Sequence, residues 1–101
     1  SWTLDLLRWM IESPEGQVVK LTHSEHTLLA ALARAPGKTV PRNELIFALG
    51  HDPLYYDQRR MEILVRRLRT KVREQLGYPL PVDTVHSQGL AFTAPVALRG
   101  S

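Results

Sequence analysis

The sequence predicts an α+β domain in which an N-terminal antiparallel sheet and a C-terminal β-hairpin enclose three helices. Three observations support this fold class: short β-favouring runs separated by turn residues at the start, apolar residues at helical spacing through the middle, and two short apolar runs joined by a turn near the end. The chain has 101 residues, 44% of them hydrophobic, which suits one domain with one modest core. We therefore expect residues 1–101 to form a single domain.

The N-terminal sheet is predicted from three short runs. Trp2–Leu7 and Arg8–Ile11 contain apolar and β-favouring residues, and Gln17–Leu21 is a third run of the same kind. Residues 13–16 (Ser-Pro-Glu-Gly) are typical of a turn, with proline at the second position and glycine at the end. The pattern indicates a small antiparallel sheet.

Two helices are predicted next. Thr22 and Glu25 are spaced as a capping box, in which the threonine hydroxyl accepts from the glutamate amide and the carboxylate accepts from the threonine amide. Leucines and alanines continue this helix to residues 35–37 (Ala-Pro-Gly), which end it. A second, short helix is expected from about Pro41 to Leu49, with proline in its first turn and a glycine just past its end.

The third helix is the longest. Residues 51–56 form a loop, because Pro53 disfavours helix at the residue before it. Asp57 can cap the helix that follows, which continues to about Leu76, and Gly77 ends it.

Strand character returns after the third helix. Val82–Val85 and Leu90–Thr93, separated by a turn at residues 86–89, predict a β-hairpin. Strands, two helices, a long helix and a hairpin, in that order, indicate a winged helix, a helix-turn-helix variant with a hairpin beside its recognition helix.

The third helix has a basic face, since seven of the thirteen Lys and Arg residues lie between Arg59 and Arg73. At 100° per residue, one apolar stripe faces the core: Met61, Leu64, Val65, Leu68 and Val72. The opposite side carries Arg59, Ile63, Arg66, Arg67, Thr70 and Arg73. A cationic face backed by an apolar face fits the DNA major groove, which admits one α-helix. The alternative is that these arginines form only a solvated surface.

Charge is distributed unevenly along the chain. Residues 1–58 carry five basic and seven acidic side chains, a net charge of −2. Residues 59–101 carry eight basic and three acidic side chains, a net charge of +5. The asymmetry predicts a polyanion-binding surface in the second half of the chain.

Five short motifs extend the similarity beyond the order of the elements. They are Leu21-Thr22-x-x-Glu25-x-x-Leu28-Leu29, Arg42-x-Glu44-Leu45, Tyr56-Asp57-x-Arg59, Arg67-Leu68-Arg69-x-Lys71, and Thr84-Val85 followed by Gly89. With these motifs in register, the chain resembles the OmpR/PhoB-type effector domain of bacterial response regulators. The similarity extends from the first strand to about Phe92.

The resemblance implies a winged helix with a four-stranded N-terminal sheet, and sequence-specific binding of double-stranded DNA in bacterial transcription regulation. It implies the output domain of a two-component phosphorelay, whose phosphorylatable receiver domain is absent from this chain. The expected contacts are helix 57–76 in the major groove, wing 82–93 in the minor groove, and loop 50–56 against RNA polymerase. A cytoplasmic location and weak self-association on DNA are also implied.

The helical face and the resemblance together give the residues expected to contact DNA: Arg59, Ile63, Arg66, Arg67, Arg69, Thr70, Arg73, Thr84 and His86. Arg67 is expected to read base edges, since arginine bound to guanine O6 and N7 is the commonest specific contact. Arg59, Arg69 and Arg73 are expected at phosphates, which set register and affinity. Ile63 suits a thymine methyl group, with a singly exposed apolar residue as the alternative.

Other polar residues near this surface have competing interpretations. Glu62 is interpreted as pairing with an arginine along the helix, with a cytosine amino group as the alternative partner. Arg42 can touch phosphate or act within the domain. Asp57 and Glu25 are assigned to helix capping.

The wing departs from the family pattern. Relatives read Thr-Val-Arg-Gly-x-Gly-Tyr-x-Phe, whereas this chain has His86 in place of the arginine and Leu90 in place of the tyrosine. A neutral imidazole is a poorer counterpart to the negative minor groove than a guanidinium. The departure motivates an alternative function: a degenerate winged helix that binds a partner protein, with weak or no base-specific DNA binding.

Catalysis, metals and membranes are not expected. His23 and His26 are spaced as a possible metal pair, but the sequence places no third ligand, and the chain has no cysteine. No glycine-rich phosphate loop or nucleophile motif is present, so no cofactor and no enzymatic activity is expected. No apolar run approaches the roughly 18–20 residues of a membrane span.

Overall fold

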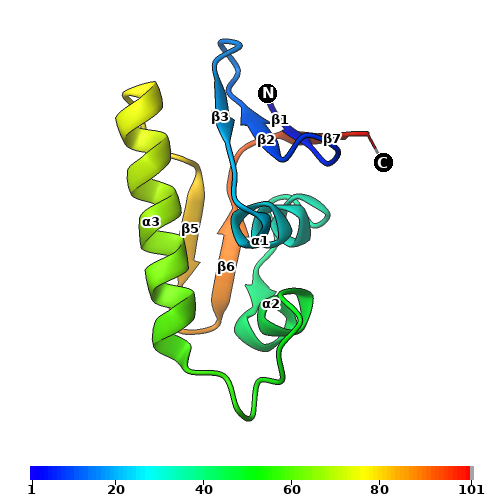
Figure 1. The fold of residues 1–101 in the computed structure, drawn as a ribbon, viewed down its shortest axis with the longest axis vertical. Coiled ribbons are helices and arrows are strands. Elements are labelled where there is room, and N and C mark those ends of the chain that lie inside the picture. The colour runs from blue at the N-terminus through cyan, green and yellow to red at the C-terminus, as the bar shows by residue number, and fades with distance from the viewer. Residues whose placement is uncertain (101) are drawn as a thin grey trace.

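The computed structural model describes residues 1–100. Strands and helices follow one another along the chain in the predicted general order (Figure 1). The elements are β1 (Trp2–Asp5), β2 (Met10–Glu12), β3 (Val18–Lys20), α1 (His23–Ala33), β4 (Val40–Pro41), α2 (Arg42–Ala48), α3 (Gln58–Leu76), β5 (Val82–Val85), β6 (Gly89–Phe92) and β7 (Val96–Arg99).

The strands form two sheets. One sheet has the order β3-β2-β1-β7, with β7 parallel to β1, and the other has the order β4-β6-β5, with antiparallel neighbours. Figure 1 shows the β5–β6 hairpin between α3 on one side and α1 and α2 on the other. This arrangement is a winged helix-turn-helix, and it confirms the predicted fold class.

The four-stranded sheet differs from the prediction in two places. Its fourth strand, β7, was not predicted: it comes from the C-terminal end of the chain and runs parallel to β1, whereas an antiparallel sheet was expected. The two-residue β4 of the other sheet was not predicted either. The second strand was predicted from Arg8, but β2 begins at Met10. The reason is a turn: the Asp5 carboxylate accepts from the amides of Leu7 and Arg8 at 3.0 and 2.9 Å, and Trp9 has a φ of 53°.

The predicted helix caps are present. Thr22 Oγ1 accepts from the Glu25 amide at 3.3 Å, and Glu25 Oε1 accepts from the Thr22 amide at 2.8 Å, which confirms the capping box. Asp57 accepts from the Arg59 amide at 2.9 Å and caps α3, and Gly77 ends α3 with a left-handed φ of 83°. Residue 41 precedes α2 as its N-cap, so α2 begins one residue later than predicted.

The apolar stripe of α3 is buried. Met61, Val65, Leu68 and Val72 face the core as predicted, and Leu64 is half-buried beside them. Burying each of these side chains contributes about 1.5–3 kcal/mol to folding. The opposite face of α3 is therefore held toward solvent.

The hairpin packs closely against β4. A Cβ on Gly89 would lie 2.0 Å from the carbonyl oxygen of Val40, so only glycine fits this position without moving backbone. The hairpin turns at His86 and Ser87, which have φ values of 35° and 59°. Its second strand ends at Phe92, one residue before the predicted Thr93.

Candidate nucleic-acid interface

The candidate interface is the solvent-facing side of α3. All six residues predicted for this side are exposed: Arg59, Ile63, Arg66, Arg67, Thr70 and Arg73. The exposed fraction of Ile63 is 40%, which is large for an isoleucine. The predicted orientation of the helix is therefore confirmed, whereas contact with DNA stays a prediction.

Most of the interface arginines keep their charge unpaired. Within residues 1–100 the ion pairs are Lys71–Glu25, Arg99–Asp5 and Arg99–Glu12. None of them neutralises an arginine of α3, so the face carries a concentrated positive potential toward solvent. The interpretation that Glu62 pairs with Arg59 or Arg66 is wrong, because none of the three pairs includes it. An ion pair between exposed side chains contributes little free energy in water, so Glu62 gains little by pairing with a neighbouring arginine.

Lys71 lies at one flank of α3 and ties the helix to α1. Its ammonium contacts the Glu25 carboxylate, which also closes the capping box. The side chains are 27% and 7% exposed, so solvent screens this pair only in part. Sequence reasoning missed this role, because the two residues are 46 positions apart and nothing local links them.

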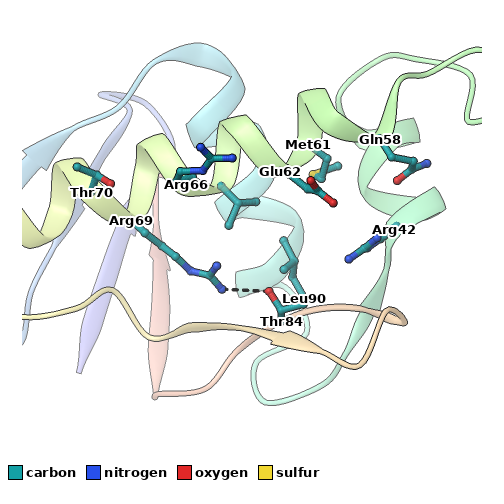
Figure 2. A pocket seen from close by; sticks show the side chains of 10 residues that line it. Arg42, Gln58, Met61, Glu62, Arg66, Arg69, Thr70, Thr84 and Leu90 are labelled. Carbon is teal, nitrogen blue, oxygen red and sulfur yellow. Dashed lines mark hydrogen bonds between the residues drawn. The ribbon is translucent and has the colours of Figure 1, made fainter.

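A cleft separates α3 from the hairpin and has a volume of about 270 Å³ (Figure 2). Its apolar lining comes from Met61, Val65 and Leu90. Polar side chains complete the lining: Arg42, Gln58, Glu62, Arg66, Arg69, Thr70 and Thr84. Three of these are guanidinium groups and one is a carboxylate, so the cleft favours anions.

Arg69 crosses this cleft toward the hairpin (Figure 2). Its Nε and Nη2 atoms donate to the Val82 carbonyl oxygen at 3.1 and 2.6 Å, and Nη2 also lies 3.4 Å from Thr84 Oγ1. Arg69 is half-buried, whereas the other arginines of α3 are exposed. Two residues predicted to contact DNA, Arg69 and Thr84, are thus engaged with each other within the domain.

The tip of the hairpin exposes His86. A hydrogen bond of 2.7 Å from the Gln88 amide to the Val85 carbonyl closes the turn. The segment from Val82 to Phe92 contains no Lys or Arg. The wing can therefore offer DNA polar and apolar contacts, but no permanent positive charge.

The loop between α2 and α3 exposes two large apolar side chains, Leu54 (84% exposed) and Tyr55 (87% exposed). Asp52 orders the loop by accepting from the Leu54 amide at 2.9 Å. Tyr56 turns inward, where the Arg60 guanidinium lies 5.0 Å from its ring centre. The exposed pair forms part of loop 50–56.

His23 and His26 lie against the Trp9 ring, with ring centres 5.0 and 5.7 Å away. Both ring nitrogens of His26 are buried without a hydrogen-bond partner. Burial lowers the pKa of His26, because desolvation disfavours the charged form, and His23 and Arg34 lower it further.

Residues 1–100 contain no group of three side chains placed to hold a metal ion. Among the helices of these residues, none combines the length and the apolar character that a membrane span requires.

Relatives of known sequence match most of the chain. AruR of Pseudomonas aeruginosa, a transcriptional regulatory protein, is 34% identical over 93 residues, which cover 92% of this chain and 38% of AruR. The regulatory protein VirG of Agrobacterium fabrum is 35% identical over 96 residues, which cover 94% of this chain and 38% of VirG. The chain thus spans less than two-fifths of the length of these relatives.

Solved structures share the fold. The DNA-binding domain of Bacillus subtilis CssR has a TM-score of 0.71 and 24% identity, covering 92% of this chain and all of that one. The RstA DNA-binding domain of Klebsiella pneumoniae, solved in complex with the RstA box, has a TM-score of 0.60 and 26% identity, covering 84% of this chain and 91% of that one.

A family model also matches most of the chain. The model described as "Transcriptional regulatory protein, C terminal" matches residues 16–92. The match runs from the turn before β3 to the end of β6, so it includes α3 and the whole hairpin. Together with AruR and VirG, it confirms the resemblance to OmpR/PhoB-type effector domains. The chain therefore belongs to the family of C-terminal domains of transcriptional regulatory proteins.

Proposed function

We propose that this domain binds double-stranded DNA with sequence specificity and thereby regulates bacterial transcription, with α3 in the major groove. The observation that carries the proposal is the row of exposed, unpaired arginines on a helix whose other side is locked into the core. The similarity to the RstA domain, which was solved with its DNA box, supports it.

The exposed residues of α3 that are expected to contact DNA have roles that suit their chemistry. Arg67 reads guanine through two parallel hydrogen bonds, worth about 1–3 kcal/mol of discrimination, and Arg66 lies beside it. Ile63 packs against a thymine methyl group. Arg59 and Arg73 bind phosphates at the two ends of the contact, and this fixes the register of the helix.

The cleft between α3 and the hairpin accommodates the DNA backbone. If α3 occupies the major groove and the wing approaches the neighbouring minor groove, the sugar–phosphate strand between the grooves passes over the cleft. Arg42 and Arg66 line it and are in none of the ion pairs of residues 1–100, so both are available to phosphate oxygens. The hydroxyl of Thr70 points into the same region (Figure 2). His86, exposed at the tip of the hairpin, is the wing residue that we propose to meet the minor groove.

The whole protein is proposed to be a cytoplasmic response regulator in which this domain is the output of a two-component phosphorelay and a receiver domain controls it. The relatives AruR and VirG are regulatory proteins more than twice as long as the chain. Loop 50–56, with its exposed Leu54 and Tyr55, is a candidate contact for RNA polymerase. Weak self-association on DNA completes the proposal.

The test starts with selection of bound duplexes from a random pool. A mobility-shift assay then compares the selected duplex with its scrambled version at 50 and 200 mM salt. We expect preference for the selected duplex and an affinity that falls steeply with salt, with a slope of about 0.9 per phosphate neutralised. Arg8→Ala is the matched control, because Arg8 is exposed on the β1–β2 turn, away from α3. Equal binding to both duplexes would refute base-specific recognition, and absence of binding would favour a protein-interaction module.

A further inference from the structure

Arg69 differs from the other arginines of α3 in both burial and partners. It is half-buried, and its guanidinium makes two hydrogen bonds to the Val82 carbonyl and a longer one to Thr84 Oγ1. The bonds join α3 to the first strand of the hairpin across 13 and 15 residues of sequence. A guanidinium occupied in this way is poorly placed to serve as a free phosphate ligand.

The partner strand explains why these bonds matter. β5 is the edge strand of the sheet β4-β6-β5, so only β6 pairs with it. The Val82 amide bonds to the Leu80 carbonyl at 2.8 Å rather than to β6. The amide and carbonyl of a strand residue point to the same side, so the Val82 carbonyl faces away from β6 and toward α3. The planar guanidinium of Arg69 donates two hydrogen bonds to this carbonyl oxygen, from Nε and Nη2, and a lysine ammonium cannot reproduce that geometry.

We propose that Arg69 is a positioning residue that sets the separation between α3 and the wing, and through it the affinity for DNA. The proposal rests on the proposed DNA binding. The hairpin touches DNA productively only at one distance from a helix seated in the major groove. The bonds from Arg69 hold the β5 end of the hairpin at that distance, and the cleft beside them stays open for the backbone strand (Figure 2).

The charge of the wing separates this role from phosphate binding. The hairpin has no Lys or Arg between Val82 and Phe92, so its contact with DNA releases no counterions, and losing that contact leaves the salt dependence unchanged. Loss of a positioning bond therefore weakens binding equally at every salt concentration. Loss of a phosphate ligand instead lowers the slope of log affinity against log salt by about 0.9.

The experiment measures affinity for the selected duplex from 50 to 200 mM salt for the unsubstituted domain, Arg69→Met, Arg69→Lys and Arg73→Met. For Arg69→Met we expect about tenfold weaker binding at every salt concentration and an unchanged slope. The affinity of Arg69→Lys for the duplex should be within about threefold of that of Arg69→Met, because lysine restores the positive charge but not the paired hydrogen bonds to the Val82 carbonyl. Arg73→Met is the matched control, and its slope should fall by about 0.9.

A second measurement uses the domain without DNA. In two-dimensional amide NMR spectra, Arg69→Met should shift the amides of β5 and the turn at residues 86–88, whereas Arg73→Met should leave them in place. Thr84→Val removes only the longest of the three contacts and should shift the same amides less. Melting curves of each variant should be recorded as a control, to check that it is folded at the temperature of the binding assay.

Two results would overturn the proposal. One is a slope that falls by about 0.9 in Arg69→Met together with full rescue by Arg69→Lys, since that combination describes a phosphate ligand. The other is an unchanged hairpin spectrum in DNA-free Arg69→Met. If the unsubstituted domain binds no duplex at all, the proposed function fails, and the DNA-free spectra alone decide whether Arg69 holds the wing.

Discussion

Removal of the Glu25 carboxylate should destabilise the whole domain, because this one group serves two elements. It accepts from the Thr22 amide in the capping box of α1 and contacts Lys71 on α3. Loss of a helix cap costs about 1 kcal/mol, and loss of a hydrogen bond between charged groups costs about 1.5–3 kcal/mol. Lys71 is 27% exposed, so solvent weakens the ion pair and the lower end of that range applies. Glu25→Ala should therefore cost about 2–3 kcal/mol.

The two contributions can be separated by thermal unfolding followed by circular dichroism. A loss of 1 kcal/mol lowers Tm by about 4–8 °C in a domain of this size, so Glu25→Ala should lower Tm by about 10–20 °C. Glu25→Gln keeps an oxygen for the Thr22 amide and removes only the charge, so it should lower Tm by about 4–10 °C. Glu15→Ala, which changes an exposed acid in the β2–β3 turn, should leave Tm nearly unchanged.

A double-mutant cycle tests the reasoning itself. Combining Glu25→Gln with Lys71→Met should recover at least about 1 kcal/mol relative to the sum of the single changes, because the two groups interact directly. A coupling free energy within about 0.3 kcal/mol of zero would refute the claim that the pair holds α3 against α1.

Three further predictions concern other parts of the domain. Gly89→Ala should cost about 1–3 kcal/mol or prevent folding, measured by urea unfolding, because its Cβ would meet the Val40 carbonyl oxygen at 2.0 Å and only backbone movement relieves the clash. Stability should fall on acidification below about pH 6.5, because burial lowers the pKa of His26 and the folded domain therefore binds fewer protons than the unfolded chain. Melting curves at pH 7.5 and 5.5 should show this loss, and His26→Phe should diminish it and raise Tm; an undiminished loss in the variant would assign the effect to another group. Arg67→Ala should relax base preference at one position of the selected duplex, whereas Arg73→Ala should weaken binding to all duplexes alike. Repeated duplex selection with both variants measures this, and two identical sequence preferences would contradict the assigned roles.

The sequence predicted those parts of the fold that depend on local signals. The bounds of the helices α1 and α3 follow from residues within one turn of an end: Thr22 and Glu25 at the start of α1, Asp57 at the start of α3 and Gly77 at the end of α3. The face of α3 follows from apolar spacing alone. The strands β4 and β7 were not predicted, because each is short and exists by pairing with a strand far away in the sequence.

The same distinction between local signals and long-range contacts applies to the candidate site. The exposed row on α3 could be listed from helical geometry, since exposure on an amphipathic helix depends only on the apolar stripe. Helical geometry does not show which of the basic residues are free to bind DNA, because that depends on hydrogen-bond and ion-pair partners on other elements of the fold. Arg69 and Lys71 belong to the same basic run as Arg67, yet both have partners on other elements. The turn after β1 was mispredicted for a related reason, because Asp5 captures two amides that the apolar pattern had assigned to a strand.

The two tethered basic residues fix how α3 is rotated about its own axis. Thr70 lies at the centre of the exposed face, and Arg69 and Lys71 project about 100° to either side of it. One is bonded to the hairpin and the other to α1, so rotation that relaxes one tether stretches the other. A rotation of about 20° would move a side-chain atom about 6 Å from the axis by about 2 Å. Such a shift is enough to break the paired hydrogen bonds by which Arg67 is proposed to read guanine, because these tolerate only a few tenths of an ångström. The base reading that we propose for the exposed row would thus depend on two cations that need not touch a base.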